Sequence, residues 1–207
     1  PDMRLDEAMP WRPAGHWQRM DAATAQLDGP FAALSLEALA HNARSMVARA
    51  AGTRLRVATK SVRSRPVLEA VLRLPGFHGV LAATLPEGLW LSATIDDVLV
   101  GYPTVDRAAL RALAADERAL ARVTLMIDSV EHLGRIDAAA PGHPPMRIAL
   151  ELDASFELGP VRAGVRRSPV RTPERLAALA RAVVERPGFE LVGLMAYEAQ
   201  VAGVQDA

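Results

Sequence analysis

The sequence predicts an α/β fold in which strands of a parallel sheet alternate with helices. Short apolar runs without strict polar alternation recur along the chain, and such runs are typical of buried parallel strands. Segments with apolar residues at helical spacing lie between them. The predicted strands are residues 55–59, 79–83, 97–101, 123–127, 147–152 and 190–196, and the helical patterns are residues 66–74, 87–93, 106–121, 129–138 and 173–185.

A further helix is predicted ahead of the first strand, over residues 36–50. Its apolar residues recur at helical spacing, Ser35 is suited to cap its N-terminus, and Gly52 is suited to end it. Residues 1–30 have weak periodicity, and we expect them to form an N-terminal arm of short helices. The remaining residues, 31–207, are expected to form the main domain.

Two α/β architectures fit this alternation, a doubly wound sheet and a (β/α)8 barrel. No strand is followed by the Gly-x-Gly-x-x-Gly turn of dinucleotide-binding doubly wound sheets. Polar residues instead end most of the predicted strands, and a barrel collects its active site from the C-terminal ends of many strands. These residues are Lys60, Thr84, Tyr102, Asp128, Asp153 and Tyr197. The pattern therefore favours the barrel.

The number of strands predicts that the barrel is incomplete in this chain. A complete barrel takes about 250 residues and eight strands, whereas about six strands are visible in 207 residues. We therefore expect the chain to be a portion of a longer protein.

Composition excludes several classes of function. The formal net charge of zero gives no electrostatic reason to bind nucleic acid or an anionic membrane. There is no cysteine, so thiolate metal sites and disulfides are excluded, and the histidines are too scattered to predict a metal site. No apolar run approaches the roughly 20 residues of a membrane helix. We expect a cytoplasmic protein.

Lys60 is the first candidate for chemistry, because it is the only lysine among 24 basic residues. It ends the first predicted strand, and Ser64 and Pro66 after it predict the start of a helix. Arginine can replace lysine in an ion pair but cannot form a Schiff base. Uniqueness and position thus suggest an imine-forming residue, while a solvated strand end or an ion pair is the alternative.

A second candidate region follows the fifth predicted strand, which ends on Glu151 and Asp153. The long loop after it carries Arg162 in an arginine-x-glycine motif, and long loops in compact domains are commonly functional. Spacing alone favours simple ion pairs of the two acids with nearby arginines. The candidate arginines are Arg166, Arg167 and Arg171.

Tyr197, one of two tyrosines, stands at the end of the last predicted strand. A buried tyrosine with a satisfied hydroxyl is one interpretation. The other is a ring that lines a flat cofactor in the mouth of a barrel.

The order of these motifs resembles the N-terminal barrel domain of the alanine racemase superfamily, from about Phe31 to the end of the chain. Within it the likeness is greatest to the D-threonine aldolase and D-serine dehydratase branch, which includes proteins called amino acid deaminase/aldolase. The motifs are residues 30–34 (PFAAL), 36–42 (LEALAHN), 56–60 (RVATK), 151–153 (ELD), 162–165 (RAGV) and 193–197 (GLMAY).

The resemblance implies a pyridoxal 5'-phosphate (PLP) enzyme that acts on D-amino acids. Lys60 would form the internal aldimine, Arg162 would hydrogen-bond the phenolic oxygen of PLP, and Tyr197 would line its ring. Asp153, with Glu151, would support Arg162 from behind. The implied reaction is aldol cleavage of a β-hydroxy-D-amino acid, or dehydration with deamination, in which the cofactor accepts electrons from the bond that breaks.

Parts of the family pattern are missing from this sequence. The glycine-rich phosphate loops and the C-terminal β-domain are not found, and in this branch that domain carries divalent-metal ligands and completes the site across a homodimer. A divalent metal would thus belong to the full-length protein, with ligands outside this chain. Ser64 stands where alanine racemases carry a tyrosine, which disfavours racemase activity.

Two other functions stay open. The chain resembles, in length, small barrel proteins of the superfamily that bind PLP for cofactor homeostasis without turnover. A barrel aldolase that forms an imine without a cofactor is the third hypothesis.

Overall fold

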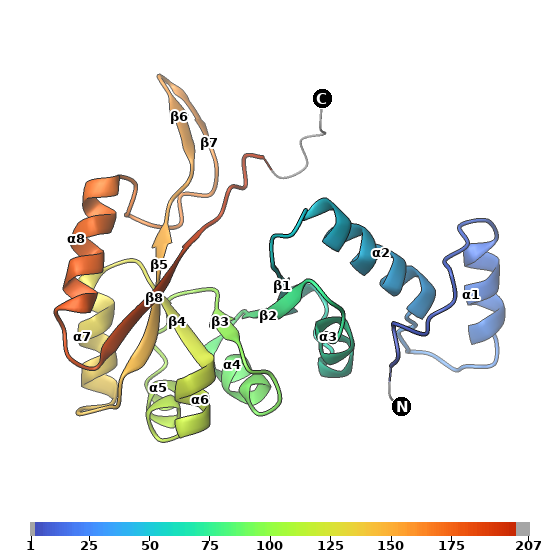
Figure 1. Cartoon of the computed structure of the whole chain (residues 1–207), viewed down its shortest axis with the longest axis horizontal. Helices are drawn as coiled ribbons and strands as arrows, with labels where there is room; N and C mark the ends of the chain where they lie inside the picture. Colours follow the sequence, from blue (N-terminus) through green and yellow to red (C-terminus); the bar gives the residue numbers. More distant parts are fainter. Residues whose placement is uncertain (1–2, 202–207) are drawn as a thin grey trace. The chain divides into compact units, whose positions relative to one another are not determined.

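The computed structural model describes residues 3–201, with Arg162 described by its backbone alone (Figure 1). The chain divides after Val80 into two compact units, Pro1–Val80 and Leu81–Ala207, which we call the first and the second unit. No helix in the described residues is long and apolar enough to cross a membrane.

The predicted α/β fold with six strands is confirmed. The strand order β1-β2-β3-β4-β5-β8 follows the sequence, apart from a separate pair, β6-β7. The six strands are β1 Leu55–Ala58, β2 Phe77–Ala82, β3 Val98–Val100, β4 Val123–Ile127, β5 Met146–Leu152 and β8 Phe189–Ala196. The division between the units falls within β2.

The first unit packs its arm against two helices. Besides β1 and most of β2 it contains α1 (His16–Thr24), α2 (Leu36–Arg49), the short 3-10 helix η1 (Thr59–Ser61) and α3 (Arg65–Leu72). Ser35 caps α2 as predicted, because its side chain accepts a hydrogen bond from the Ala38 amide. Leu5 of the arm is buried with Ala40 of α2 and with Ala70 and Val71 of α3. One buried leucine thus anchors the arm.

The second unit contains an unbroken parallel ladder. β3 pairs with β4, β4 with β5 and β5 with β8, all parallel. Every residue of β4 is buried, which explains why all but Thr124 are apolar. Because the strands are parallel, their C-terminal ends lie at the same edge of the sheet, and any side chains that end these strands are neighbours.

Helices cover this ladder. α4 (Leu85–Ser92), α6 (Glu117–Arg122), α7 (Val130–Ala139) and α8 (Pro173–Val184) contact the strands, while α5 (Arg107–Ala114) packs on α4, α6 and α7. Figure 1 shows α7 and α8 beside β5 and β8. The prediction of one helix over residues 106–121 was wrong. Asp116 leaves the helical conformation and accepts a hydrogen bond from the Ala119 amide, so it starts α6.

A second correction concerns the loop predicted after β5. It contains an antiparallel hairpin of β6 (Phe156–Leu158) and β7 (Val161–Ala163), which projects beyond the end of β5 in Figure 1. Gly159 and Pro160 form its turn, with Gly159 at a φ of +57°. Strands of three residues are too short to show an alternating pattern, which is why the sequence predicted a loop.

Candidate functional site

Lys60 lies in η1, directly after β1. The turn is fixed by Thr59, which is fully buried and whose carbonyl accepts hydrogen bonds from the amides of Val62 and Arg63. The Lys60 side chain itself is exposed and makes no hydrogen bond or ion pair within the described part of the chain. The backbone of this residue is therefore held, whereas its amine is left available.

Two of the polar residues that end strands in the second unit have local structural roles. The Thr84 hydroxyl caps α4 by accepting a hydrogen bond from the Glu87 amide, and the Glu87 carboxylate accepts one from the Ala83 amide. Asp128, after β4, lies 3.1 Å from Nδ1 of His132 on α7. These contacts satisfy both residues without any ligand.

The two tyrosines that end strands converge on one arginine. The guanidinium carbon of Arg167 lies 5.0 Å from the ring centroid of Tyr102, after β3, and 5.1 Å from that of Tyr197, after β8. Both distances are within the range of cation–π contacts. Residues far apart in the sequence thus meet at the C-terminal edge of the ladder.

The same arginine neutralises a buried acid at the end of β5. Nε and Nη2 of Arg167 lie 2.8 and 2.6 Å from Oε1 of Glu151, whose side chain is only 3% exposed. Ser168 donates a hydrogen bond from its hydroxyl to the Glu151 carbonyl. A buried carboxylate requires such a partner, because an uncompensated charge is costly away from water.

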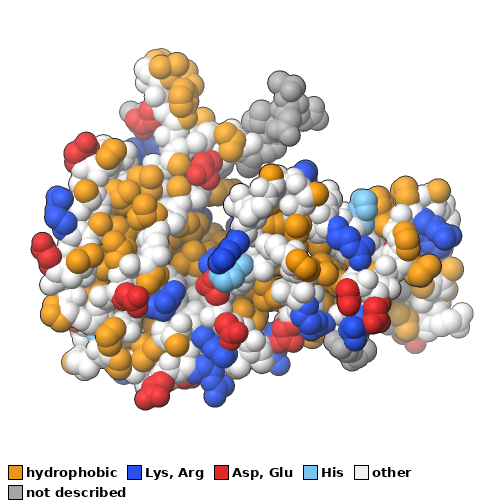
Figure 2. All heavy atoms as spheres, viewed as in Figure 1, with side chains coloured by type: hydrophobic (Ala, Val, Ile, Leu, Met, Phe, Trp, Pro, Cys, Tyr) orange, Lys and Arg blue, Asp and Glu red, His pale blue; other side chains and the backbone are white. Residues whose placement is uncertain are grey.

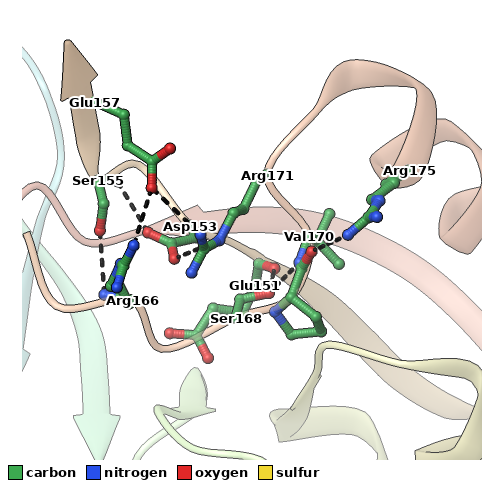
Figure 3. Close-up of polar contacts among 10 residues, drawn as sticks. Glu151, Asp153, Ser155, Glu157, Arg166, Ser168, Val170, Arg171 and Arg175 are labelled. Carbon is green, nitrogen blue, oxygen red and sulfur yellow. Dashed lines mark hydrogen bonds and ion pairs between the residues drawn. The ribbon is translucent and has the colours of Figure 1, made fainter. Parts of the chain in front are cut away.

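Asp153 is held in a second network, which Figure 3 shows from β5 to the start of α8. Its Oδ1 accepts a hydrogen bond from the Ser155 amide at 2.9 Å, and its Oδ2 lies 3.3 Å from Nε of Arg171. Burial raises the pKa of this carboxyl, but the Ser155 hydrogen bonds and the charges of Arg171 and Arg166 outweigh it, so the pKa lies below its usual value. Asp153 is therefore an anion at neutral pH.

Arg162 lies in β7, where its backbone is opposite Glu157. The glycine of its motif, Gly164, has a φ of +126°, and a Cβ at this position would lie only 2.7 Å from the Cα of Ser155. Ser155 also accepts a hydrogen bond from the Arg166 amide (Figure 3). The arginine-x-glycine spacing thus has a local cause, since only glycine allows the chain to turn back past Ser155.

The ion pairs that spacing alone favoured for the two acids are confirmed. Glu151 pairs with Arg167, and Asp153 pairs with Arg171, while Arg166 pairs with Glu157 at 3.3 Å. Because these contacts go to other arginines, support of Arg162 by the two acids stays a prediction. Sequence reasoning missed Arg167 as a common contact. The available signal was a strand that ends on acids, with two consecutive arginines, Arg166 and Arg167, in the loop that follows it.

The structure thus places Asp153, Arg162 and Tyr197 in the second unit and Lys60 in the first. No group of acids, histidines or cysteines that could hold a metal ion is found in the described residues.

The parallel strands, the helices that cover them and the polar residues at the strand ends are typical of proteins with an α/β barrel fold. The alanine racemase N-terminal domain family matches residues 34–207. The chain belongs to this family, as its motifs predicted, and the family depends on PLP.

Relatives within the family are enzymes of D-amino acid chemistry. The chain is 29% identical over 177 residues to 3-hydroxy-D-aspartate aldolase of Paracoccus denitrificans, a match that covers 84% of this chain and 43% of the relative. Similar solved structures include D-threonine aldolase from Filomicrobium marinum (TM-score 0.65, 26% identity, 82% of this chain and 44% of the other). Another is D-threo-3-hydroxyaspartate dehydratase from Delftia sp. HT23 (TM-score 0.63, 26% identity, 83% and 44%).

Alanine racemase from E. faecalis is similar in fold alone, with a TM-score of 0.60 at 20% identity over 81% of this chain and 43% of that one. The chain spans less than half the length of each of these proteins.

Proposed function

We propose that this chain is the PLP-binding barrel portion of a lyase that acts on D-amino acids. The reaction is aldol cleavage of a β-hydroxy-D-amino acid, or its dehydration with deamination, and the working protein is a homodimer. Family membership and the named activities of the aldolase and dehydratase relatives support this proposal. The observation that carries it is Lys60, the only lysine, which lies on a hydrogen-bonded turn and whose amine has no partner among the described residues.

The residues present fit the cofactor. A primary amine can bond to the aldehyde carbon of PLP only if no carboxylate holds it, and Lys60 has no such partner in the described chain. Tyr197 is 42% exposed, so part of this residue is accessible to a ligand. The turn at Gly164 fixes the backbone close to Arg162, the proposed donor to the phenolic oxygen.

In this proposal Lys60, Arg162 and Tyr197 have different roles. Lys60 would hold the cofactor through its amine and would carry a proton to or from the α-carbon of the substrate. Arg162 and Tyr197 would hold the cofactor in a fixed orientation, which would select the bond to the α-carbon that is cleaved. Bound PLP supplies the electron sink for that cleavage.

The first test is a PLP titration followed by absorbance at the edge of the visible range. The wild-type protein should develop this absorbance, and Lys60→Ala and Lys60→Arg should not, because neither side chain can form the imine. Arg54→Ala is a matched control, since Arg54 is an exposed basic residue of the same unit. A Lys60→Ala protein that binds PLP covalently would overturn the assignment.

The second test is turnover by the full-length protein, of which this chain is the proposed barrel portion, loaded with PLP and a divalent metal. Incubation with D-threonine or 3-hydroxy-D-aspartate should release glycine and an aldehyde if the reaction is an aldol cleavage, and ammonia and a keto acid if it is a dehydration. Covalent cofactor binding with neither product would instead indicate a PLP-binding protein without turnover.

A further inference from the structure

Arg167 has more partners than charge balance requires. Its guanidinium is stacked on both Tyr102 and Tyr197, while Nε and Nη2 are directed at Oε1 of the buried Glu151. An arginine that served only to neutralise Glu151 would need no aromatic neighbour, and a lysine could replace it. The guanidinium is instead contacted by the Glu151 carboxylate at Nε and Nη2, and by each tyrosine ring at a cation–π distance.

The backbone around Arg167 is fixed as well. The adjacent residue, Ser168, is 2% exposed, and its hydroxyl donates to the Glu151 carbonyl at 2.7 Å and accepts from the Val170 amide at 3.0 Å. The Asp153 amide donates to the Val170 carbonyl at 2.8 Å. Arg167 thus lies in a segment that is held to the end of β5 by backbone and side-chain hydrogen bonds.

The rings, in contrast, are only partly covered. Tyr102 is 41% exposed and Tyr197 is 42% exposed, whereas the Arg167 side chain is 22% exposed. The arginine is therefore more buried than either tyrosine, and part of each tyrosine is left accessible to solvent. Such an arrangement orders an aromatic surface without filling it.

We propose that Arg167 is a positioning residue that fixes the Tyr197 ring as the surface against which the PLP ring packs. This inference rests on the proposed function and deepens it, because it gives a role to a residue outside the motifs of the family resemblance. Arg167 acts through Tyr197 and does not itself contact the cofactor. Without the guanidinium contact the Tyr197 ring gains rotational freedom, and the entropy lost when the ring is ordered on binding then weakens PLP affinity.

The test uses Arg167→Lys, which keeps a positive charge for Glu151 but loses the planar stack. PLP affinity, measured by titration, should fall roughly tenfold, in line with the loss of a desolvated cation–π contact. Arg181→Lys is the matched control, because Arg181 is an exposed residue of α8 in the same unit, and its affinity should equal that of wild type. Tyr102→Leu, which leaves Glu151 and Tyr197 in place, should give a smaller loss.

A second measurement needs no cofactor. The chain has two tyrosines, so selective tyrosine labelling gives two NMR signals that Tyr102→Phe and Tyr197→Phe assign. Both signals should shift in Arg167→Lys and stay unchanged in Arg181→Lys. Urea unfolding of each variant separates a loss of ring order from a loss of stability.

The outcomes distinguish the two proposals. Wild-type protein that binds PLP covalently, with an Arg167→Lys variant of equal affinity or an unmoved Tyr197 signal, would overturn the positioning role and leave the proposed function intact. Wild-type protein that does not bind PLP would overturn both, even if the tyrosine signals shift as expected.

Discussion

Two regions carry the candidate chemistry, and the fold treats them in opposite ways. Around Lys60 only the backbone is fixed, through the buried Thr59, and the amine has no partner in the described chain. Around Arg167 the side chain is held by an ion pair with Glu151 and by contacts with two tyrosine rings. The difference matches two different tasks, since a nucleophile must be free to react and a binding surface must be ordered beforehand.

The stability of the protein should depend more on the region around Arg167 than on the region around Lys60. A buried ion pair makes its own network sensitive to the loss of either member. An exposed, unpaired lysine contributes little to folding. Substitutions near Arg167 should therefore lower the free energy of unfolding, whereas substitution of Lys60 should abolish PLP binding with little effect on stability.

The largest loss of stability should follow Glu151→Ala, which leaves Arg167 half-buried without its carboxylate. We expect the free energy of unfolding to fall by about 3 to 5 kcal/mol. Glu157→Ala is the control, because Glu157 also pairs with arginines but its side chain is 41% exposed, and about 0 to 1 kcal/mol is expected there. Urea unfolding measures both, and equal losses would show that Glu151 is not the anchor of this region.

Gly164→Ala should be next. A methyl group there would lie 2.7 Å from the Ser155 Cα at a φ of +126°, so a loss of about 2 to 4 kcal/mol is expected from strain and overlap. Gly159→Ala in the same hairpin has a φ of +57° and open space around it, and about 1 kcal/mol is expected. A Gly159 variant as damaged as the Gly164 variant would contradict the role given to Ser155.

Asp153→Asn should have a smaller, pH-dependent effect. The pKa of Asp153 is lowered from its usual 3.8, with burial opposed by hydrogen bonds from Ser155 and by Arg171 and Arg166. Its anion therefore stabilises the fold at pH values above about 4, and this contribution is lost as the pH falls through the lowered pKa. Urea unfolding of wild type and variant should differ at pH 7 and converge in acid. A constant difference would mean that the charge is not responsible.

The smallest effect on stability should come from Lys60→Ala. The side chain is exposed and unpaired in the described chain, so the free energy of unfolding in the absence of PLP should change by no more than about 0.5 kcal/mol. Added PLP should then stabilise the wild type and not the variant, because a ligand stabilises only the protein that binds it. Thermal melts with and without PLP make this comparison.

Much of the fold could be predicted because its signals are local. β4 was predicted with its observed bounds, since a run of five residues of which four are apolar is typical of a buried strand. Ser35 predicted the start of α2 because capping depends on a hydrogen bond three residues away. The break at Asp116 and the hairpin β6-β7 were missed. At Asp116 a single capping residue breaks a longer helical pattern, and the strands of the hairpin are too short to show a pattern of their own.

The candidate site was less predictable, because its contacts are long-range. The sequence named Lys60 by its uniqueness, and it offered three arginines as partners for two acids. It could not choose among them, since the choice depends on how Gly164 and Arg166, both at positive φ, turn the chain past Ser155. Figure 2 shows charged and apolar groups mixed over the face that is visible.

Reductive labelling tests most directly whether Lys60 bonds covalently to PLP. The protein is mixed with PLP, reduced with borohydride and digested, and the peptides are weighed by mass spectrometry. The account predicts a pyridoxyl group on the peptide that contains Lys60 and none in Lys60→Ala. An unmodified Lys60 in the reduced wild-type protein would contradict it.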